Sequence, residues 1–331
     1  MENIFFSIII PVYNGIHHRL DSCLSHIWKQ YRNNYPFEVI CVDDCSTDGT
    51  KEWIEEQQVN YPNLKLLVNK YNLRQGGARN EGVKNASGKY IIFIDQDDYI
   101  DDNAIESLYN ILSADDLDLL LCDYVWQMRG KESKTLVHYM SQTPIMTGES
   151  YLTHFPIAAA PWRFVFKKEL MLEKHIWFAE HTRIEDIDWG IRMTYHAKKM
   201  IYAPLLLIHH NRDDGSTTFD IYKNPQVIYD MLGASKRVYE LTQNELKDSS
   251  IQKIILNCSE HNQLLGLKYL FGVKASFSEK KKCLSNMPQY ITQYPILNFV
   301  KRHSYIFCLL AFIFSPLYRI TLYFYRAIYY R

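Results

Sequence analysis

At 331 residues, the chain has room for one large α/β domain with an extension or for two modest domains. Its 37 basic and 37 acidic side chains cancel, which argues against a nucleic-acid-binding protein. Seven cysteines without a CxxC pair argue against a disulfide framework or a zinc site and favour a reducing compartment. The first residues lack a basic region and Pro11 soon closes their apolar stretch, so no signal peptide is expected.

The first hundred residues alternate between short apolar runs and helical spacing. The apolar runs predict strands at residues 5–12, 37–42, 64–68 and 90–94. Helices are expected at residues 17–31, around Trp53 and Ile54, and at residues 76–85. This alternation with short connections predicts an α/β fold, with a doubly wound, mostly parallel sheet flanked by helices.

Three carboxylates follow the fourth predicted strand directly. Asp95, Asp97 and Asp98 come after the apolar run at 91–94, at the strand end where α/β sheets bind ligands. Clustered carboxylates repel one another unless a cation neutralises them, and a Mg²⁺ or Mn²⁺ ion carrying a diphosphate fits that need. The alternative is that these acids cap the helix that begins near Asp102.

The second half of the chain is less regular and ends in helical spacing. A helix at 104–112 and a strand at 117–125 precede shorter elements, and the pattern is helical from Pro225 onward. We therefore expect a first domain at residues 1–220, with halves at 1–100 and 101–220, and a helical C-terminal extension at residues 221–331.

The last residues, 305–331, differ in character from the rest. Residues 305–317 carry no charge but are fewer than the ~20 apolar residues that span a bilayer. Arg319 and Arg326 are seven residues apart, so they share one helical face. The pattern predicts a helix lying on an anionic membrane surface, the alternative being a terminal helix packed on the body.

The first predicted turn excludes one class of nucleotide-binding domain. After the first strand the chain reads Pro11-Val12-Tyr13-Asn14-Gly15, without the GxGxxG cradle of a nicotinamide-binding domain. Asp44, at the end of the second strand, can accept hydrogen bonds from a base imide or a ribose hydroxyl. It can equally cap a helix.

Five segments occur in a characteristic order: SIIIPVYN (7–14), VDDCSTDGT (42–50), NLRQGGARN (72–80), FIDQDD (93–98) and RIEDIDW (183–189). Together they resemble the sequence blocks of inverting glycosyltransferase family 2, which adopts the GT-A fold. The resemblance covers roughly residues 4–220 and implies a nucleotide-diphosphate-sugar donor, a divalent metal and a single displacement at the anomeric carbon.

The resemblance also implies roles for individual residues. They are donor binding by Pro11, Val12, Tyr13, Asp44, Arg79, Asp95 and Gln96, metal binding by Asp95 and Asp97, and general-base catalysis by Asp186. Asp44 would hold the base, and Arg79 would reach the nucleotide or diphosphate. A base of this kind removes the acceptor's proton, while the metal neutralises the leaving diphosphate. Without the resemblance, Asp186 would be read as a helix-capping acid.

Two residues depart from the family pattern. Cys45 and Arg74 stand where the family usually has glycine. A left-handed backbone at either position is costly for a residue with a side chain, so the local loop geometry is open.

Three further side chains are candidates for the site. His210 follows an apolar strand at 205–208 and is expected to complete the metal shell, the alternative being a surface histidine. Trp162 and Trp189 are candidate stacking platforms for the acceptor sugar, although large aromatics more often belong to a core.

The sequence thus predicts an inverting, Mn²⁺- or Mg²⁺-dependent glycosyltransferase that uses a UDP-sugar. It would act on a glycan or lipid-linked acceptor of a surface polysaccharide, as a cytoplasmic protein peripheral to the inner membrane face. A sugar-1-phosphate nucleotidyltransferase is the nearest alternative, but its Gly- and Arg/Lys-rich loop is absent at residues 13–19. A catalytically silent nucleotide-binding scaffold is the other, and the joint presence of Asp44, Asp95, Asp97 and Asp186 argues against it.

Overall fold

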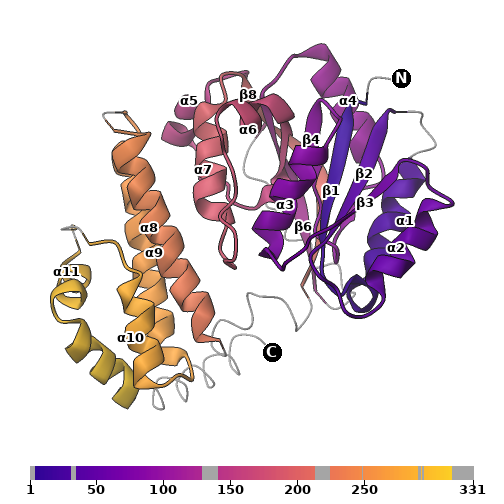
Figure 1. Ribbon diagram of the computed structural model, residues 1–331. Helices are drawn as coiled ribbons and strands as arrows, with labels where there is room; N and C mark the ends of the chain where they lie inside the picture. Colours follow the sequence, from indigo (N-terminus) through magenta and orange to yellow (C-terminus); the bar gives the residue numbers. More distant parts are fainter. Residues whose placement is uncertain are drawn as a thin grey trace. The chain divides into compact units, whose positions relative to one another are not determined.

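A computed structural model describes residues 4–30, 35–128, 141–212, 224–247, 249–289, 292 and 294–314. The chain divides into two compact units, Met1–Asp213 and Asp214–Arg331 (Figure 1). The sequence predicted this boundary at residue 220.

The first unit is built on an eight-stranded sheet in the order β3-β2-β1-β4-β7-β6-β8-β5. Its strands are β1 (Phe6–Val12), β2 (Phe37–Asp43), β3 (Leu64–Val68), β4 (Tyr90–Phe93), β5 (Tyr99–Ile100), β6 (Leu119–Met128), β7 (Phe164–Lys167) and β8 (Met200–Arg212). Strands β1 to β4 pair in parallel, as predicted. β7 lies antiparallel between β4 and β6, whereas β6 and β8 pair in parallel and β5 closes the edge antiparallel to β8.

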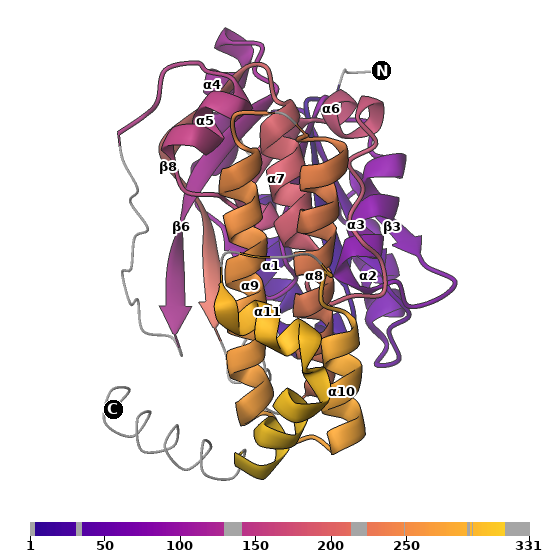
Figure 2. The ribbon, with the colours of Figure 1, turned by 90° about the vertical axis from the view of Figure 1, so that its left-hand side faces the viewer.

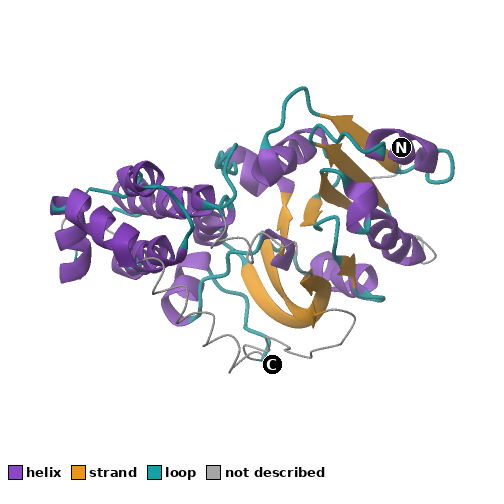
Figure 3. Cartoon of the chain, turned by 90° about the horizontal axis from the view of Figure 1, so that it is seen from below, coloured by secondary structure: helices purple, strands orange, loops and turns teal. Residues whose placement is uncertain are grey.

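Helices cover both faces of the sheet (Figure 3). They are α1 (Leu20–Gln30), α2 (Thr50–Gln58), α3 (Arg74–Asn85), α4 (Ala104–Ala114), α5 (Gly148–His154), α6 (Lys168–Glu173) and α7 (Asp186–His196), with short 3₁₀ turns at Gly15–His18 and Pro161–Arg163. Because alternate strand residues point to opposite faces, Ile8 and Ile10 of β1 join one core cluster and Ile9 joins the other.

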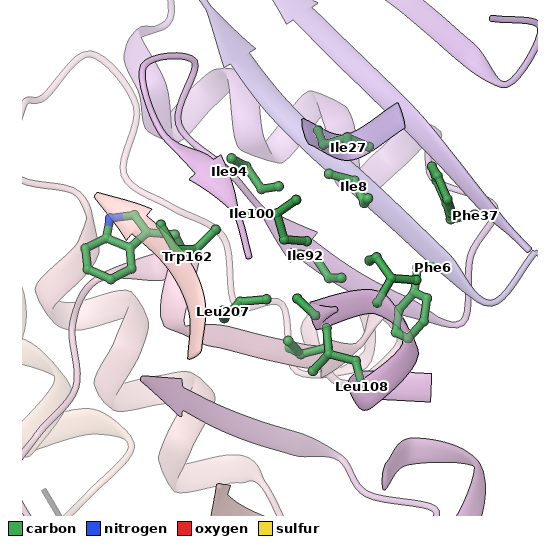
Figure 4. Packing of buried hydrophobic residues seen from close by; sticks show 14 of the residues in the cluster. Phe6, Ile8, Ile27, Phe37, Ile92, Ile94, Ile100, Leu108, Trp162 and Leu207 are labelled. Atoms are coloured by element: carbon green, nitrogen blue, oxygen red, sulfur yellow. The ribbon is translucent and has the colours of Figure 1, made fainter. Parts of the chain in front are cut away.

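One core cluster packs β1, β2 and β4 against α1 and α4. Figure 4 shows its central side chains, among them Ile8, Ile27, Ile92 and Leu108, all fully buried. The second cluster lies under α3 and α7 and is centred on Phe93 and Trp189. Burial on both faces explains why β1 and β2 are apolar along almost their whole length.

The second unit is helical. Its helices are α8 (Pro225–Asn244), α9 (Gln252–Gly272), α10 (Phe277–Ser285) and α11 (Pro295–Arg302), followed by a helix at Ser304–Phe314. Figure 2 shows α8 and α9 side by side. A separate apolar core joins these helices, and the buried Lys280 donates to the backbone carbonyls of Leu270 and Val273 at the end of α9.

Candidate functional site

The site lies at the carboxyl edge of the parallel strands. Val12 at the end of β1 is in register with Asp43 at the end of β2, and Ile9 pairs with Phe93 at the end of β4. The segments that follow these strands therefore meet at one edge of the sheet. They carry most of the residues that the sequence singled out, and α3 and α7 add Arg79 and Asp186.

Gln96 ties the segment after β1 to the acidic segment after β4. Its Oε1 accepts from the backbone N–H of Tyr13 at 2.9 Å, and its Nε2 donates to the carbonyl of the same residue at 3.0 Å. The Gln96 amide thus bonds to both backbone groups of Tyr13, as an adjacent β-strand would. The Tyr13 ring is 49% exposed, so it is available as one wall of a ligand site. Gln96 was predicted to bind donor, and in this structure its amide holds the backbone beside the predicted base pocket.

Asp44 is the centre of a second network. Its Oδ1 accepts from Asn69 Nδ2 and from the Leu73 N–H, and its Oδ2 accepts from the Arg74 N–H, each at 2.8 Å. The side chain is buried. Asp44 therefore fixes the connection from β3 to α3, an arrangement that accounts for all three of these contacts without a ligand.

Both residues that depart from the family pattern adopt the left-handed backbone conformation. Cys45 has φ 70° and Arg74 has φ 66°. Left-handed geometry costs a residue with a side chain on the order of 1–2 kcal/mol. The Arg74 N–H bond to Asp44 and the contact of Cys45 Sγ with the Asn69 carbonyl at 3.4 Å help to hold this geometry. The turns that the family makes with glycine are thus kept here without it.

Arg79 joins the acidic segment to the start of α7. Its Nη2 lies 2.8 Å from Asp95 Oδ1, and its Nη1 lies 2.6 Å from Glu185 Oε1. The guanidinium is 2% exposed and stacks near the rings of Phe93 and Phe178. It was predicted to reach the nucleotide or diphosphate. The structure places it as a buried bridge between two carboxylates.

Glu185 is a site residue whose role the sequence did not reveal. It appeared only as the neighbour of the predicted base, yet its ion pair with Arg79 spans 106 positions of the chain. Gly76 makes room for it. A Cβ at Gly76 would lie 2.6 Å from the Ala179 carbonyl oxygen and 3.0 Å from the Glu185 side chain. The RQGGARN segment therefore lets α3 approach the 179–185 loop closely.

The three acids after β4 have different surroundings. Asp98 is fully buried, and its carboxylate accepts from the Asn211 N–H at 2.8 Å and contacts His210 Nδ1 at 2.7 Å. Burial, together with the charges of Asp98 and Asp95, raises the pKa of Asp97 to about 7. Carboxyl groups thus crowd a buried segment, and a cation bound there would favour their ionised forms.

His210 is fixed by its neighbours. Its ring stacks on Trp162, with centroids 5.0 Å apart, and its Nδ1 meets Asp98. Burial lowers the pKa of His210, but the bond to Asp98 and the nearby acids outweigh it and raise that pKa. A histidine whose one nitrogen is held by a carboxylate presents the other nitrogen in a fixed direction, as metal-ligating histidines do.

Oxygen-rich side chains with one such imidazole fit Mn²⁺ or Mg²⁺ in chemical type. Over the described parts of the chain, however, no three His, Cys, Asp or Glu side chains are grouped to hold an ion together. The described protein side chains alone would therefore not complete the coordination shell of such an ion.

Asp186 is the first residue of α7 and is partly buried. Burial, and then the charge of the adjacent Glu185, raise its pKa to about 7. A carboxyl group with a pKa near neutrality is suited to accept a proton at physiological pH. The Arg79–Glu185 ion pair fixes the residue next to it.

The two predicted tryptophan platforms are core residues. Trp189 is fully buried and stacks on Phe178 at 4.3 Å, with Phe93, Phe164 and Phe166 around it, so its prediction as an acceptor platform is wrong. Trp162 is 7% exposed and packs against Tyr124 and His210. Arg212 ends β8, and residues 213–217 lie outside the described residues.

Comparisons with known proteins agree on one family. Residues 7–171 match the model described as Glycosyl transferase family 2. The uncharacterized glycosyltransferase YibD of Escherichia coli is 28% identical over 212 residues, which cover 60% of this chain and 58% of YibD. The poly(ribitol-phosphate) beta-N-acetylglucosaminyltransferase TarS of Staphylococcus aureus is 24% identical over 291 residues, which cover 86% of this chain and 48% of TarS. The chain spans about half the length of these curated relatives.

A crystal structure of part of TarS in complex with UDP-GlcNAc matches the fold with a TM-score of 0.69. The match covers 99% of this chain and 93% of that one, at 21% sequence identity. It confirms the predicted GT-A-type architecture.

Proposed function

The chain carries a glycosyl transferase family 2 domain, and from this premise we propose that it transfers a sugar from a nucleotide diphosphate to a hydroxyl of a glycan. The observation that carries the proposal is the ion-pair chain Asp95–Arg79–Glu185. It links the acidic segment after β4 with the start of α7, where Asp186 lies. A donor-binding acid and a candidate base are thereby held at one edge of the sheet.

The proposed donor is a UDP-sugar. TarS, the relative with the similar fold, has been crystallised with UDP-GlcNAc. Under this proposal the exposed Tyr13 lines the nucleoside site, and Pro11 and Val12, which are buried at the end of β1, lie behind it. Asp44 fixes the loop that leads to Arg74. The proposed contact of Asp44 with the base would be made at the edge of that loop.

The proposed cofactor is Mn²⁺ or Mg²⁺. Asp97 and Asp95 would hold the ion, with the imidazole of His210 beside them, and the donor's diphosphate oxygens would complete the shell. The support is that Asp95, Asp97 and Asp98 crowd one segment after β4, where burial first, and then the charges of Asp98 and Asp95, raise the pKa of Asp97. When bound, the ion supplies positive charge next to the leaving diphosphate.

The proposed reaction is a single displacement with inversion. Asp186 accepts the proton of the acceptor hydroxyl as the hydroxyl oxygen bonds to the anomeric carbon, and the bond from that carbon to the diphosphate oxygen breaks with its electron pair. Arg79 acts indirectly, because it orients Asp95 and Glu185. Gln96 acts indirectly too, because it holds Tyr13 in place.

The proposed acceptor is a surface polysaccharide or a lipid-linked glycan, and the proposed setting is the cytoplasmic face of a membrane. The support for the acceptor is that TarS is named for transfer to poly(ribitol-phosphate), a polymer.

Asp186→Asn tests the proposal, because it keeps the shape of the side chain and removes the proton acceptor. We expect transfer from a UDP-sugar to fall ~10²–10⁴-fold. Binding of UDP with Mn²⁺, followed by titration calorimetry, should persist. Equal turnover in variant and parent would remove Asp186 as the base. A product that keeps the donor's anomeric configuration would remove the inverting mechanism, and release of pyrophosphate from UTP and a sugar phosphate would identify a nucleotidyltransferase instead.

A further inference from the structure

The end of the second unit exposes an unusual amount of apolar surface. Nine of the fifteen large apolar side chains that are exposed among the described residues fall between positions 296 and 314. On α11 they are Ile296 and Phe299, and on the next helix they are Tyr305, Ile306, Leu309, Leu310, Phe312, Ile313 and Phe314. We name this set the apolar elbow. The remaining six are scattered over the first unit, as single surface residues usually are.

The two helices of the elbow are apolar on both sides. Leu297, Val300, Phe307 and Cys308 point inward and belong to the core of the second unit. The opposite side carries the exposed set, with Ile306, Leu310 and Ile313 in one stripe at helical spacing. The sequence offered a packed helix or a membrane-facing helix as alternatives. The structure shows a helix that packs on one side and leaves an apolar face on the other.

Along the sequence, the segment that contains the elbow carries charged side chains of one sign. From Lys281 to Arg331 the chain holds seven lysine and arginine residues and no aspartate or glutamate. Lys281, Lys282 and Arg302 are exposed on α10 and α11. The whole chain is neutral, so positive charge is concentrated in this part of the sequence, and the described cations lie on the two helices α10 and α11.

A small hollow lies between α10 and the elbow. It measures about 150 Å³, and its polar lining includes Lys281, Ser285, Lys301 and Ser304. Burial lowers the pKa of Lys301 to about 8, against the opposing effect of the Glu260 charge. An anion in the hollow would favour the charged lysine, and hydroxyl groups beside ammonium groups suit a phosphate.

From these features we propose that the apolar elbow is a membrane-docking surface, which lies in the interface of an anionic bilayer with a lipid headgroup phosphate in the hollow. Apolar side chains enter the acyl boundary, and the surrounding cations face the headgroups. Over the described residues, no single helix is long and apolar enough to cross a bilayer, although α11 and the next helix, bent by 102°, pass that test together. The exposed apolar face and the positive charge favour helices that lie in the membrane interface over helices that cross the bilayer.

The test is flotation of the full chain with lipid vesicles. Vesicles of equal parts phosphatidylglycerol and phosphatidylcholine should carry the protein at low salt, and pure phosphatidylcholine vesicles should carry much less. The triple variant Ile306→Ser, Leu310→Ser and Ile313→Ser changes only exposed positions and should bind at least about tenfold more weakly. The matched control, Val59→Ser with Ile145→Ser, removes exposed apolar side chains of the first unit and should bind like the parent.

A second variant separates charge from apolar contact. Lys281→Gln with Lys301→Gln should weaken binding to the anionic vesicles by about fivefold per cation and leave binding to neutral vesicles unchanged. Circular dichroism of each variant checks that it is folded, a readout that does not depend on sugar transfer.

Three results with vesicles would overturn the proposal. They are a parent chain that stays with the soluble fraction, a triple variant that floats like the parent, and retention on vesicles after an alkaline carbonate wash, which indicates a broken span. Should the parent be a dimer that the triple variant dissociates, the elbow is an interface between copies and the proposal is wrong.

Discussion

At the scale of single residues, polar side chains of the site mainly hold the protein's own backbone. Asp44 fixes the loop before α3, and Gln96 pairs with both backbone groups of Tyr13. Burial and like charge disfavour ionisation and raise the pKa values of Asp97 and Asp186 to about 7. The charge of these two carboxyl groups is therefore sensitive, near neutral pH, to what binds beside them.

Gln96→Ala tests whether that side chain positions the nucleoside site. Loss of two hydrogen bonds to Tyr13, each worth about 0.5–1.5 kcal/mol, should raise KM for the donor about fivefold or more and change kcat little. Steady-state kinetics with a UDP-sugar give both constants. Gln75→Ala, at an exposed position of α3, is the matched control. A fall in kcat with KM unchanged would contradict a positioning role.

Asp97→Asn should make the metal-free protein more stable at pH 8. The folded state holds the pKa of Asp97 at about 7, above its ordinary value, so folding becomes less favourable as pH rises from about 4 to 7. The variant removes this penalty at pH 8 and has little effect near pH 4, where the penalty has barely begun to develop.

Thermal unfolding in EDTA measures the effect, and each kcal/mol corresponds to about 2–4 °C in Tm. Asp116→Asn is the control with the opposite sign, because Lys167 and Lys89 hold the pKa of Asp116 at about 2. Equal Tm values for parent and Asp97→Asn at pH 8 would show that the Asp97 carboxylate is not strained by its surroundings.

At the scale of elements, buried polar contacts decide how the helices meet the sheet edge. Arg79 on α3 reaches Asp95 after β4 and Glu185 before α7, and the absence of a side chain at Gly76 permits the close approach. Strand β7 intervenes between β4 and β6, and Trp189 of α7 packs beneath the site on Phe93 of β4. The sheet edge that carries the candidate site is thus tied to the second core cluster.

Arg79→Gln should destabilise the first unit strongly. It leaves the carboxylates of Asp95 and Glu185 without their shared cation, and breaking a buried pair from one side costs about 3–5 kcal/mol. Denaturant unfolding measures the loss. Arg74→Gln removes an exposed guanidinium at the start of the same helix and should change stability by less than about 0.5 kcal/mol. Similar losses for the two variants would show that the bridge is not specific.

At the scale of the whole molecule, the two units have separate cores. The clusters of the first unit draw on residues between Phe6 and Ile208, and that of the second on residues between Ile228 and Cys308. The proposed donor site lies wholly within the first unit, and the apolar elbow lies within the second. Sugar transfer and membrane docking are therefore assigned to different parts of the chain.

A fragment of residues 1–213 should fold and bind UDP with Mn²⁺ as tightly as the full chain does. The reason is that all residues proposed to bind donor, and both cores beneath them, belong to this unit. Titration calorimetry compares the two affinities. A folded fragment without UDP affinity would mean that the second unit contributes to the donor site.

The sequence by itself determined the features that depend on neighbouring residues. Apolar runs identified β1 to β4, and the acids of FIDQDD were expected at a strand end, because strand ends and the residues after them are contiguous in the chain. The ordered blocks indicated the family, and the change from strand to helical spacing indicated a separate helical extension. The sequence also showed that Cys45 and Arg74 stand where the family usually has glycine. It did not show whether the backbone would be left-handed at these positions.

The tertiary structure decided the contacts between distant positions. The Arg79–Glu185 pair spans 106 positions, and the His210–Asp98 pair spans 112, so no local pattern reveals them. The burial of Trp189 showed that it is not a sugar platform. The sequence could not show this, because a tryptophan in a core and one on a surface look the same in sequence. The two-sided character of the helix at Ser304–Phe314 also required the fold, because which apolar face is covered depends on the neighbouring helices.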